Sequence, residues 1–381
     1  METSASGSDR AYKPDYAVSP GETLAEMLNE RGMSQAELAR RTGISTKHVN
    51  LILKGSAPIS PDTALKLERV LNVSARVWNA LEANYRGHLS RLEESRQLQQ
   101  HVGWASKALV NELIRRGCIS QFADRVEQLG EVLRFFGVAS VTAWNAIWDQ
   151  SAATAAYRKA KLEGDPVALA AWMRIGELRA GEVAAKPFDR ERFRRVLEEV
   201  RRLTRETDPE VWCPQLAQLC LSAGVVVVIE PELPKARVNG IARWITPTTA
   251  LIQLSLRYLR DDIFWFTFFH EAAHLLLHGK RAGPKDVPQT FIDMKPDLPM
   301  FVDTGKSAGQ REDEANAFAA NILVPPETAA RLPFITTLDD VRTLASEVGV
   351  SPGIIVGRLH HEEIKPHNWG TALFVRYRFV D

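Results

Sequence analysis

The sequence WFTFFHEAAHLLLHG at residues 265–279 is the stretch around which the 381-residue chain is organised. An α-helix turns about 100° per residue, so His270 and His274 lie one turn apart on the same face. Two imidazoles at that spacing are typical ligands of one zinc ion, and Glu271 can act as general base on a water that the ion activates. The flanking apolar residues indicate a helix buried in a core. Unpaired histidine and glutamate side chains would be costly there, which argues against a chance occurrence of the pattern.

A third metal ligand has to come from another part of the chain. Residue 280, where a metzincin carries a histidine, is Lys280. His278 follows His274 by one more turn, but three ligands on one straight helix cannot enclose an ion tetrahedrally. We therefore interpret His278 as a residue that orients a ligand or packs beside it.

Residues 311–326 predict a second helix, whose apolar stripe has i, i+3, i+4 spacing. Glu312 falls on that stripe, and a carboxylate facing a core needs a partner such as a metal ion. Asn316, one turn later, is expected to orient a ligand. Glu314 points to the opposite side. The alternative is that all three acids at 312–314 are ordinary first-turn residues facing the helix dipole.

The HEAAH motif followed by EDEANAFAANILVP at residues 312–325 resembles the ImmA/IrrE metallopeptidases over roughly residues 219–359. That resemblance implies a gluzincin-like core with zinc as cofactor. It makes His270, His274 and Glu312 the zinc ligands and Glu271 the catalytic acid/base. The chain departs from the family at Ala272-Ala273, where a glycine is commoner, and the departure should be harmless.

Composition is that of a soluble globular protein. Hydrophobic residues make up 45% and charged residues 25% of the chain, and the net charge of +1 gives no overall attraction to nucleic acid. Three cysteines, none in a CxxC pair, argue against a disulfide framework and for a reducing compartment. No apolar run has the length needed to cross a bilayer, and no signal segment is recognisable. We therefore expect a cytoplasmic protein with no membrane partner.

A second decisive stretch is SQAELARRTGISTKHVNLILKG at residues 34–55. Ser34 and Glu37 have the spacing of a helix-capping box, and Gly43 permits a tight turn before a helix over residues 45–53. This pattern predicts a helix-turn-helix. Residues 31–54 carry five basic residues and one acidic residue, a local excess that suits phosphate contacts.

The second helix of a helix-turn-helix enters the major groove of DNA. Its outward residues are expected to read base edges, and two neighbouring residues are expected to hold the phosphate backbone. The predicted base-reading residues are Thr46, Lys47, His48 and Asn50, and the predicted phosphate contacts are Gln35 and Lys54. The alternative is a small helical bundle whose polar face binds protein.

Residues 18–86 resemble the Cro/C1-type (XRE) domain of host-inhibition-of-growth antitoxins. Besides the motif above, the resemblance rests on the opening Pro20-Gly21-Glu22 and on the closing Trp78 and Tyr85. It implies a five-helix bundle that binds operator DNA as a homodimer. It is less specific for a toxin partner, because many repressors share this fold.

The remaining patterns complete the predicted architecture. Residues 87–210 have helical spacing throughout, and their role cannot be read from the pattern. Short β-branched or apolar segments at 225–229, 240–244 and 250–254 predict a small antiparallel sheet beside the zinc helix. The expected fold class is mainly α with that sheet (α+β). The expected domains are a disordered terminus at 1–17, the helix-turn-helix domain at 18–86, a helical middle region at 87–210 and the metallopeptidase domain at 211–381.

Two functions of different classes fit these motifs. In the first, a DNA-binding transcriptional regulator is fused to a zinc-dependent endopeptidase. That enzyme cleaves a protein partner, such as a repressor or a toxin, in stress response or in toxin–antitoxin or mobile-element control. In the second, the peptidase-like domain of an antitoxin or repressor binds a ligand or a toxin without catalysis. The first is favoured because a purely structural metal site has no need of Glu271.

Overall fold

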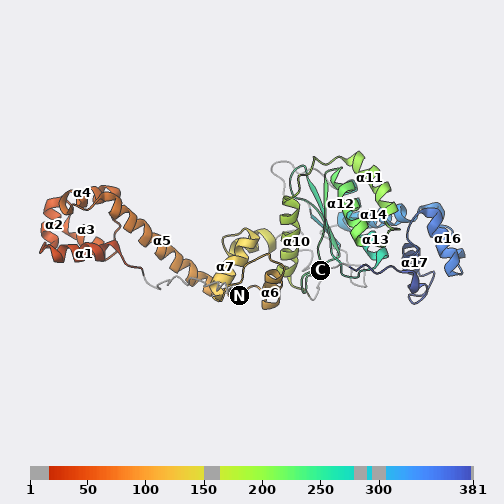
Figure 1. The fold of residues 1–381 in the computed structure, drawn as a ribbon, viewed down its shortest axis with the longest axis horizontal. Helices are drawn as coiled ribbons and strands as arrows, with labels where there is room; N and C mark the ends of the chain where they lie inside the picture. The colour runs from red at the N-terminus through yellow and green to blue at the C-terminus, as the bar shows by residue number, and fades with distance from the viewer. Residues whose placement is uncertain (1–16, 150–163, 279–289, 294–305, 379–381) are drawn as a thin grey trace, which may run out of the picture. The chain divides into compact units, whose positions relative to one another are not determined.

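The computed structural model describes residues 17–149, 164–278, 290–293 and 306–378 (Figure 1). The chain divides into two compact units, residues 1–102 and 103–381. The predicted α+β class is confirmed, since a helical first unit is followed by a unit of helices around a small sheet. The terminus expected to be disordered, residues 1–17, lies outside the described residues except for its last position. None of the helices in the described ranges is both long and apolar enough to cross a membrane.

Five helices make up the described part of the first unit, as predicted. They are α1 (Pro20–Glu30), α2 (Gln35–Thr42), α3 (Thr46–Leu53), α4 (Pro61–Leu71) and α5 (Ala75–Gln99). A serine caps each N-terminus, because its hydroxyl accepts a backbone N–H that has no partner within the helix. Gly43 has a φ of +71° and begins the turn into α3. Gly21 of α1 lies so close to the backbone of Ile52 in α3 that any larger residue would clash.

Helix α5 extends well beyond the small core of the first unit. It begins at Ala75 and runs without a break through residue 86, the predicted end of the helix-turn-helix domain. Its only fully buried residues are Ala75 and Trp78, both in the first turn. The later turns therefore project polar side chains, as the composition of residues 88–100 indicates.

Residues 103–210 of the predicted middle region belong to the second unit, whereas residues 87–102 belong to the first. The elements that follow α5 are α6 (Lys107–Arg115), α7 (Arg125–Phe136), α8 (Val141–Trp144), the π-helix η1 (Asn145–Asp149), α10 (Pro166–Gly181), α11 (Arg190–Leu203) and α12 (Pro209–Leu221). Trp144 and Trp172 share one hydrophobic core with Leu233 and Ile241, which belong to the segment around the second strand. The indole N–H of Trp172 also donates to the carbonyl oxygen of Glu230 at 2.9 Å.

The sheet has four strands in the order β1-β3-β2-β4: β1 (Val225–Ile229), β2 (Gly240–Trp244), β3 (Ala250–Leu254) and β4 (Thr290–Asp293). The prediction of a wholly antiparallel sheet is wrong, because β1 runs parallel to β3 while β2 is antiparallel to both β3 and β4. The hairpin of β2 and β3 inserts β3, rather than β2, beside β1. Strand patterns give the length of each strand but not this order.

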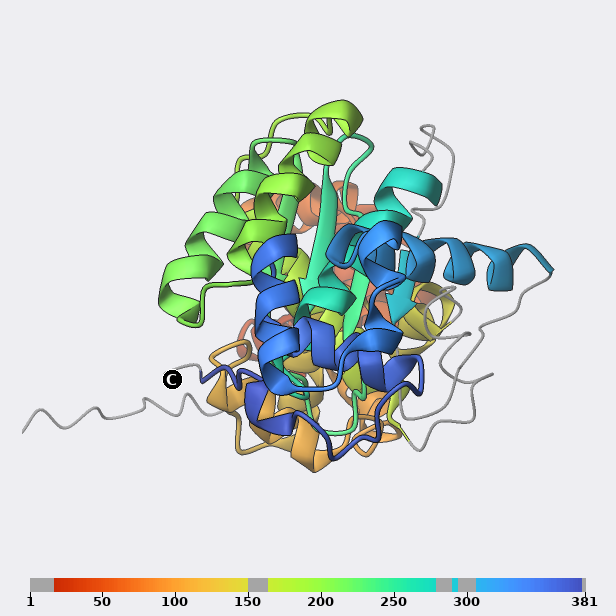
Figure 2. The same cartoon turned by 90° about the vertical axis from the view of Figure 1, so that its right-hand side faces the viewer.

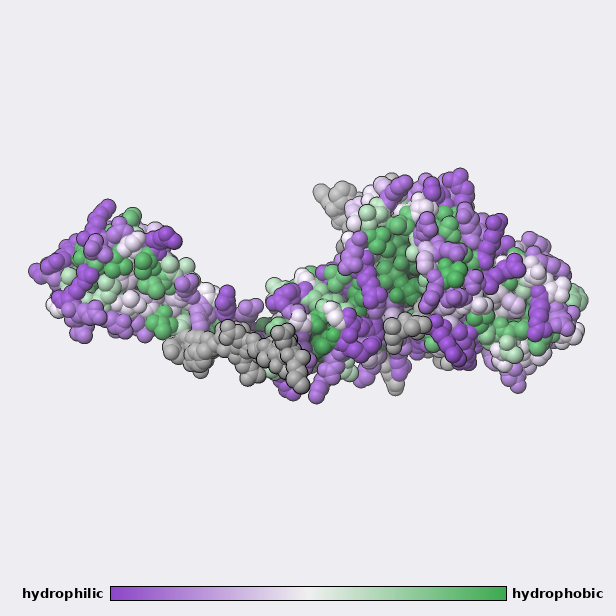
Figure 3. Space-filling model, viewed as in Figure 1, coloured by the Kyte–Doolittle hydropathy of each residue, from purple (hydrophilic) through white to green (hydrophobic). Residues whose placement is uncertain are grey.

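Helices cover both faces of the sheet, so β2 and β3 are buried on both sides. Helix α10 packs on one face, where the amide of Gln253 donates to the carbonyl oxygen of Trp172 at 2.7 Å. The other face carries Ala250, Ile252 and Leu254 and packs against α13 (Asp261–Ala273). Figures 1 and 2 show the strands between these helices, and Figure 3 shows apolar residues gathered over the strands with hydrophilic residues around them.

The remaining elements surround α13. They are the π-helix η2 (His274–His278), α14 (Lys306–Leu323), α15 (Pro326–Ala329), the 3₁₀ helix η3 (Leu332–Phe334), α16 (Leu338–Val348), α17 (Pro352–His361) and the 3₁₀ helix η4 (Thr371–Leu373). Helix α14 runs along α13, and α17 crosses its start. Gly353 and Gly357 allow that crossing, because a larger residue at either position would clash with Asp261 or Asp262.

Candidate metal centre

Apolar residues hold helix α13 in the core, and its two histidines, His270 and His274, face α14. The side chains of Trp265, Phe268 and Phe269 are fully buried in the main core of the second unit. His270 and His274 are 2% and 0% exposed, so the protein buries two polar rings that need partners. The partners come from α14, which packs against α13 along this stretch.

The geometry of three side chains fits a metal ion. The Nε2 atoms of His270 and His274 lie 3.0 Å apart. The carboxylate oxygens of Glu312 lie 3.2 Å from the first nitrogen and 3.4 Å from the second. Two ligands at tetrahedral angles and about 2.05 Å from a zinc ion are about 3.3 Å apart. Within the described ranges, these three residues are the one group of histidine, cysteine and acidic side chains that could hold a metal ion.

Hydrogen bonds on the far side of each imidazole orient the two rings. Nδ1 of His270 lies 3.0 Å from the amide oxygen of Asn316 and donates to it. Nδ1 of His274 lies 3.2 Å from Nδ1 of His278, whose Nε2 lies 2.9 Å from a carboxylate oxygen of Glu314. A proton on each Nδ1 leaves both Nε2 atoms with a lone pair. Two such lone pairs and a carboxylate converge on one point, and a cation there would relieve their repulsion.

Electrostatics keep these groups in the forms that bind metal. Burial lowers the pKa of His274, although the hydrogen bond with Glu312 acts in the opposite direction. Burial alone would raise the pKa of Glu312, but the close approach of His270 and His274 lowers it to about 2. Either Nε2 donates to Glu312 only while that nitrogen carries a proton, and a bound metal ion takes the place of that proton. A metal ion needs neutral imidazoles and an ionised carboxylate. The surroundings favour both.

Glu271 lies on the same helix and next to the sheet. It is fully buried, and the start of β2 approaches it closely. A methyl group added at Gly240 would lie 3.1 Å from both Cγ and Oε1 of Glu271 and 2.7 Å from Cγ2 of Thr267. Only a glycine lets the strand approach the carboxylate in this way.

Two features of this centre could not be predicted from the sequence. Glu314 points away from the core and its carboxylate is exposed, as expected, but it also binds His278 at 2.9 Å. Residues 274–278 form a π-helix rather than a continuation of the α-helix, which changes the direction of His278. A turn of this kind leaves no clear mark in the sequence.

The predicted DNA-contact residues lie on α2 and α3 of the first unit. Thr46, Lys47, Gln35 and Lys54 are exposed, and His48 and Asn50 are half-buried. The amide nitrogen of Asn50 donates to the side-chain oxygen of Gln35 at 3.2 Å, so the two helices present one joined polar surface.

The one acidic residue of the basic stretch is bound within α2. Glu37 accepts from Nε of Arg41 at 2.6 Å and also pairs with Arg40. Hydrogen bonds from the two arginines lower the pKa of Glu37. The Ser34 hydroxyl caps the helix, but the side chain of Glu37 does not complete the predicted capping box. Glu37 thus neutralises only one of its two arginines, and Arg31, Lys47 and Lys54 carry most of the remaining positive charge of this region.

Comparison with known proteins agrees with both parts of the chain. Residues 24–78 match the model of a helix-turn-helix family, and residues 220–360 match the peptidase-family model described as the IrrE N-terminal-like domain. The HTH-type transcriptional regulator YddM of Escherichia coli (strain K12) is 33% identical over 63 residues, which are 16% of this chain and 67% of that protein. Virulence-associated protein I of Dichelobacter nodosus is 33% identical over 82 residues, 21% of this chain and 74% of that protein.

Two solved structures are also similar to part of the chain. An addiction module antidote protein of the HigA family from Coxiella burnetii is 30% identical, covering 22% of this chain and 92% of that chain, with a TM-score of 0.21. The Pseudomonas aeruginosa antitoxin HigA, solved with the higBA promoter, is 32% identical, covering 22% of this chain and 94% of that chain, with a TM-score of 0.21.

Proposed function

We propose that the chain is a DNA-binding regulator carrying a zinc-dependent endopeptidase. The premise is that it belongs to the helix-turn-helix family through residues 24–78 and to the family of the IrrE N-terminal-like domain through residues 220–360. One observation supports the enzyme above all others. The donor atoms of His270, His274 and Glu312 converge within 3.0–3.4 Å of one another. Glu271 is buried one residue after the first of them.

The donor set fits zinc. Two imidazoles and one carboxylate are the protein ligands of one class of catalytic zinc site, in which a fourth position stays open for water or substrate. When bound, zinc supplies a Lewis acid that polarises a carbonyl group and makes a water molecule more acidic. His270, His274 and Glu312 would hold it. Asn316 and His278 would keep the two imidazoles in the orientation and tautomer that binding requires.

Glu271 is the residue to which we assign proton transfer. As general base it would accept a proton from the attacking water, and as general acid it would give a proton to the leaving amine. Its burial suits this exchange, because a desolvated carboxylate is a better proton acceptor than one in bulk water. The close approach of β2 at Gly240 limits the positions that the carboxylate can take.

The first unit would deliver this activity to DNA. Helix α3 would enter the major groove, with Thr46, Lys47, His48 and Asn50 reading base edges. Gln35 and Lys54 would contact phosphates. The similarity to the regulator YddM supports this role. A homodimer on a double-stranded operator with two half-sites is the arrangement that such domains commonly adopt.

The substrate of the enzyme would be a protein partner, such as a repressor or a toxin, cleaved in stress response or in toxin–antitoxin or mobile-element control. The competing possibility is a repressor or antitoxin whose second unit binds a ligand or a toxin without catalysis. The two differ in whether Glu271 matters. In the non-catalytic protein, replacing Glu271 would leave every cellular effect of the chain intact.

The deciding experiment has two steps. Elemental analysis of the wild type should find about one zinc ion per chain, and Glu312→Gln should lose most of it. The wild type and Glu271→Gln should then be compared for cleavage of proteins that bind the chain. Zinc in both proteins with cleavage by the wild type alone supports the peptidase. No zinc in a wild type supplied with zinc, or equal behaviour of the two proteins, rejects it.

A further inference from the structure

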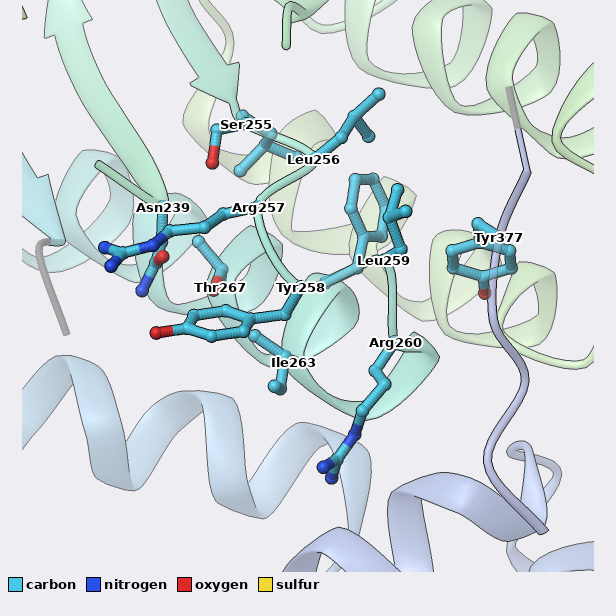
Figure 4. A pocket seen from close by; sticks show the side chains of 12 residues that line it. Asn239, Ser255, Leu256, Arg257, Tyr258, Leu259, Arg260, Ile263, Thr267 and Tyr377 are labelled. Atoms are coloured by element: carbon cyan, nitrogen blue, oxygen red, sulfur yellow. The ribbon is translucent and has the colours of Figure 1, made fainter. Parts of the chain in front are cut away.

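The pocket shown in Figure 4 is too small to serve as a binding site. It lies between residues 254–260, at and after the end of β3, and the start of α13, and it is also lined by Asn239 and Tyr377. Its interior has room for about 20 Å³, which is the space of a single water molecule. None of the candidate metal-centre residues lines it. The outer edge of the sheet is a larger surface without an assigned role.

Strand β1 forms one edge of the sheet, because β3 is its only neighbouring strand in the described ranges. Two hydrogen bonds at its ends show which way its backbone groups point. The N–H of Glu230 donates to the carbonyl oxygen of Leu254, and the carbonyl oxygen of Gly224 accepts from the N–H of Ala250. The N–H and C=O groups of one residue in a strand point to the same side, and those of the next residue point to the opposite side. The even-numbered residues from 224 to 230 therefore face β3.

The odd-numbered residues of β1, which are Val225, Val227 and Ile229, consequently point their backbone groups away from the sheet. No residue in the described part of the chain pairs with these groups. Such an edge is a template for another strand, and proteins usually protect it with a charged residue, a proline or a bulge. The other edge strand, β4, carries Asp293, whereas residues 225–229 contain neither a charge nor a proline. We therefore expect the edge of β1 to be covered by another strand.

The side chains around this edge are apolar. Helices α10 and α12 both pack on β1, and the space-filling view shows apolar surface where the strands pass between them (Figure 3). Val227 and Ile229 are half-buried, and so is Leu221 at the end of α12. A strand laid along the edge would remove this surface from water while it paired the backbone groups.

The edge of β1 is complementary to a second copy of itself. Two β1 strands related by a two-fold axis at Val227 would run antiparallel, with Val227 opposite Val227 of the second copy and Val225 opposite Ile229. Each of these is a hydrogen-bonded pair, in which the two residues exchange both N–H···O bonds. Three outward residues on each strand give about six such bonds, so all the outward groups of residues 225–229 find partners. A shift of the register by two residues would leave some of them unpaired.

We propose that β1 pairs antiparallel with β1 of a second copy of the chain, so that the two four-stranded sheets join into one. The interface is isologous, because both copies contribute the same patch. Val226 lies opposite Val228 on the α10 face, so the side-chain pairs across the axis are apolar on both faces of the joined sheet. This contact lies in the second unit and depends neither on zinc nor on catalysis, and it is separate from the homodimer proposed for the helix-turn-helix domain.

The test is a site-specific cross-link in the full chain. The Cα atoms of a hydrogen-bonded pair lie about 5.5 Å apart, which is within reach of a disulfide. Val227→Cys treated with oxidised glutathione should therefore form a disulfide-linked dimer, which a non-reducing gel detects. Ile229→Cys is the matched control, because its two copies would lie about 14 Å apart along the paired strands. Val227→Cys should link at least about ten times faster, since pairing holds its thiols at a millimolar local concentration.

Two further controls report random collisions between chains. They are the wild type, which has three cysteines of its own, and Ser346→Cys at an exposed position of α16. Neither should form more than traces of linked dimer. A dimer held by the helix-turn-helix domains alone would give no preference for residue 227 over residue 229.

Hydrogen exchange of the backbone amides gives a second readout. In the wild type, the amides of Val225, Val227 and Ile229 should be protected by the second copy. Val227→Lys places two like charges opposite each other at the axis, so this protection should be lost. The amides of Val226 and Val228 bond to β3 with or without a second copy. Their continued protection in Val227→Lys shows that the variant is folded.

The outcomes distinguish the second copy from other occupants of the edge. Preferential linking at residue 227, together with protection that Val227→Lys removes, supports the pairing. Equal linking of Val227→Cys and Ile229→Cys, or rapid exchange of the odd-numbered amides in the wild type, overturns it. Protection of those amides without linking at residue 227 means that a different segment covers the edge, and this result also overturns the pairing.

Discussion

The side chains of His278 and Glu314 meet at 2.9 Å, between Nε2 of the imidazole and a carboxylate oxygen. The other nitrogen of His278 lies 3.2 Å from Nδ1 of His274, one of the candidate ligands. A carboxylate on the surface of α14 thus fixes the proton position on a ring buried beneath it. The amide of Gln310 in turn donates to Glu314 at 3.0 Å.

Replacing His278 or Glu314 should therefore weaken zinc binding without removing a ligand. Loss of such an orienting partner typically costs ten- to a hundred-fold in metal affinity. We expect His278→Phe to raise the zinc dissociation constant by about that factor and Glu314→Gln by about ten-fold. Competition with a chromophoric chelator measures both. Asp313→Asn, an exposed neighbour with the same loss of charge, is the control. An equal rise of the zinc dissociation constant in Asp313→Asn and Glu314→Gln would contradict a role for the relay, the hydrogen-bonded chain from His274 through His278 to Glu314.

The sequence is sufficient for the parts of this centre that depend on local spacing. His270 and His274 follow from one helical turn, and Glu312 with Asn316 follow from another. The relay from His274 to Glu314 does not follow, because it needs the π-helical turn and the packing of α14 against α13. The order of the strands cannot be predicted from the sequence for a similar reason. The position of β3 between β1 and β2 is decided by contacts between segments far apart in the chain.

Asn50 should determine which DNA sequence the first unit prefers. Its amide is held by Gln35 at 3.2 Å and is thus positioned before DNA is bound. Asn50→Ala should lose about 1–3 kcal/mol of discrimination between the operator and random DNA. Gln35→Ala should cost less discrimination, because it removes the contact that positions Asn50 and a proposed phosphate contact but no base contact. Fluorescence anisotropy with both DNAs at one salt concentration measures this. Equal losses on operator and random DNA would refute a base-reading role for Asn50.

Lys54 should act differently, through charge alone. It is exposed just after α3, and a phosphate contact would release a bound counterion. Lys54→Ala should weaken binding to all DNA by a similar factor and reduce the slope of log K against log salt by about one. Lys66→Ala is the control, because Lys66 lies on α4 and pairs with Asp62 at 2.7 Å. An unchanged slope in Lys54→Ala would exclude the phosphate contact.

The carboxylate of Glu230 should stabilise the second unit. It is 1% exposed, lies 2.5 Å from Arg116 and also contacts Arg179, so it ties α6 and α10 to the end of β1. Glu230→Gln removes one of the two carboxylates that pair with the buried guanidinium of Arg116, the other being Glu112, and should lower the free energy of unfolding by roughly 1–3 kcal/mol. Urea unfolding measures it. Glu347→Gln breaks an exposed pair with Arg331 and should change the midpoint little. Equal effects of the two changes would contradict the role of burial.

The stability of the second unit should fall as pH rises through the range in which Asp261 ionises. Burial raises the pKa of Asp261 to about 6, against the hydrogen bonds that it accepts from the Ser351 hydroxyl and the Val375 N–H. The unfolded chain loses this proton near its usual value of 3.8, so the folded state holds a proton that the unfolded state has lost. The contribution is therefore complete below about pH 4 and is lost as pH rises through 6, by up to about 3 kcal/mol.

Asp261→Asn should remove this dependence. In metal-free protein, the difference in free energy of unfolding between the variant and the wild type should grow in favour of the variant from pH 4.5 to pH 7.5. Urea unfolding followed by tryptophan fluorescence measures it, because Trp265 lies one turn further along the same helix. Asp339→Asn changes an exposed acid in α16, and its free energy of unfolding should depend on pH as that of the wild type does. Parallel curves for Asp261→Asn would mean that the carboxyl group at the start of α13 keeps an ordinary pKa despite its burial.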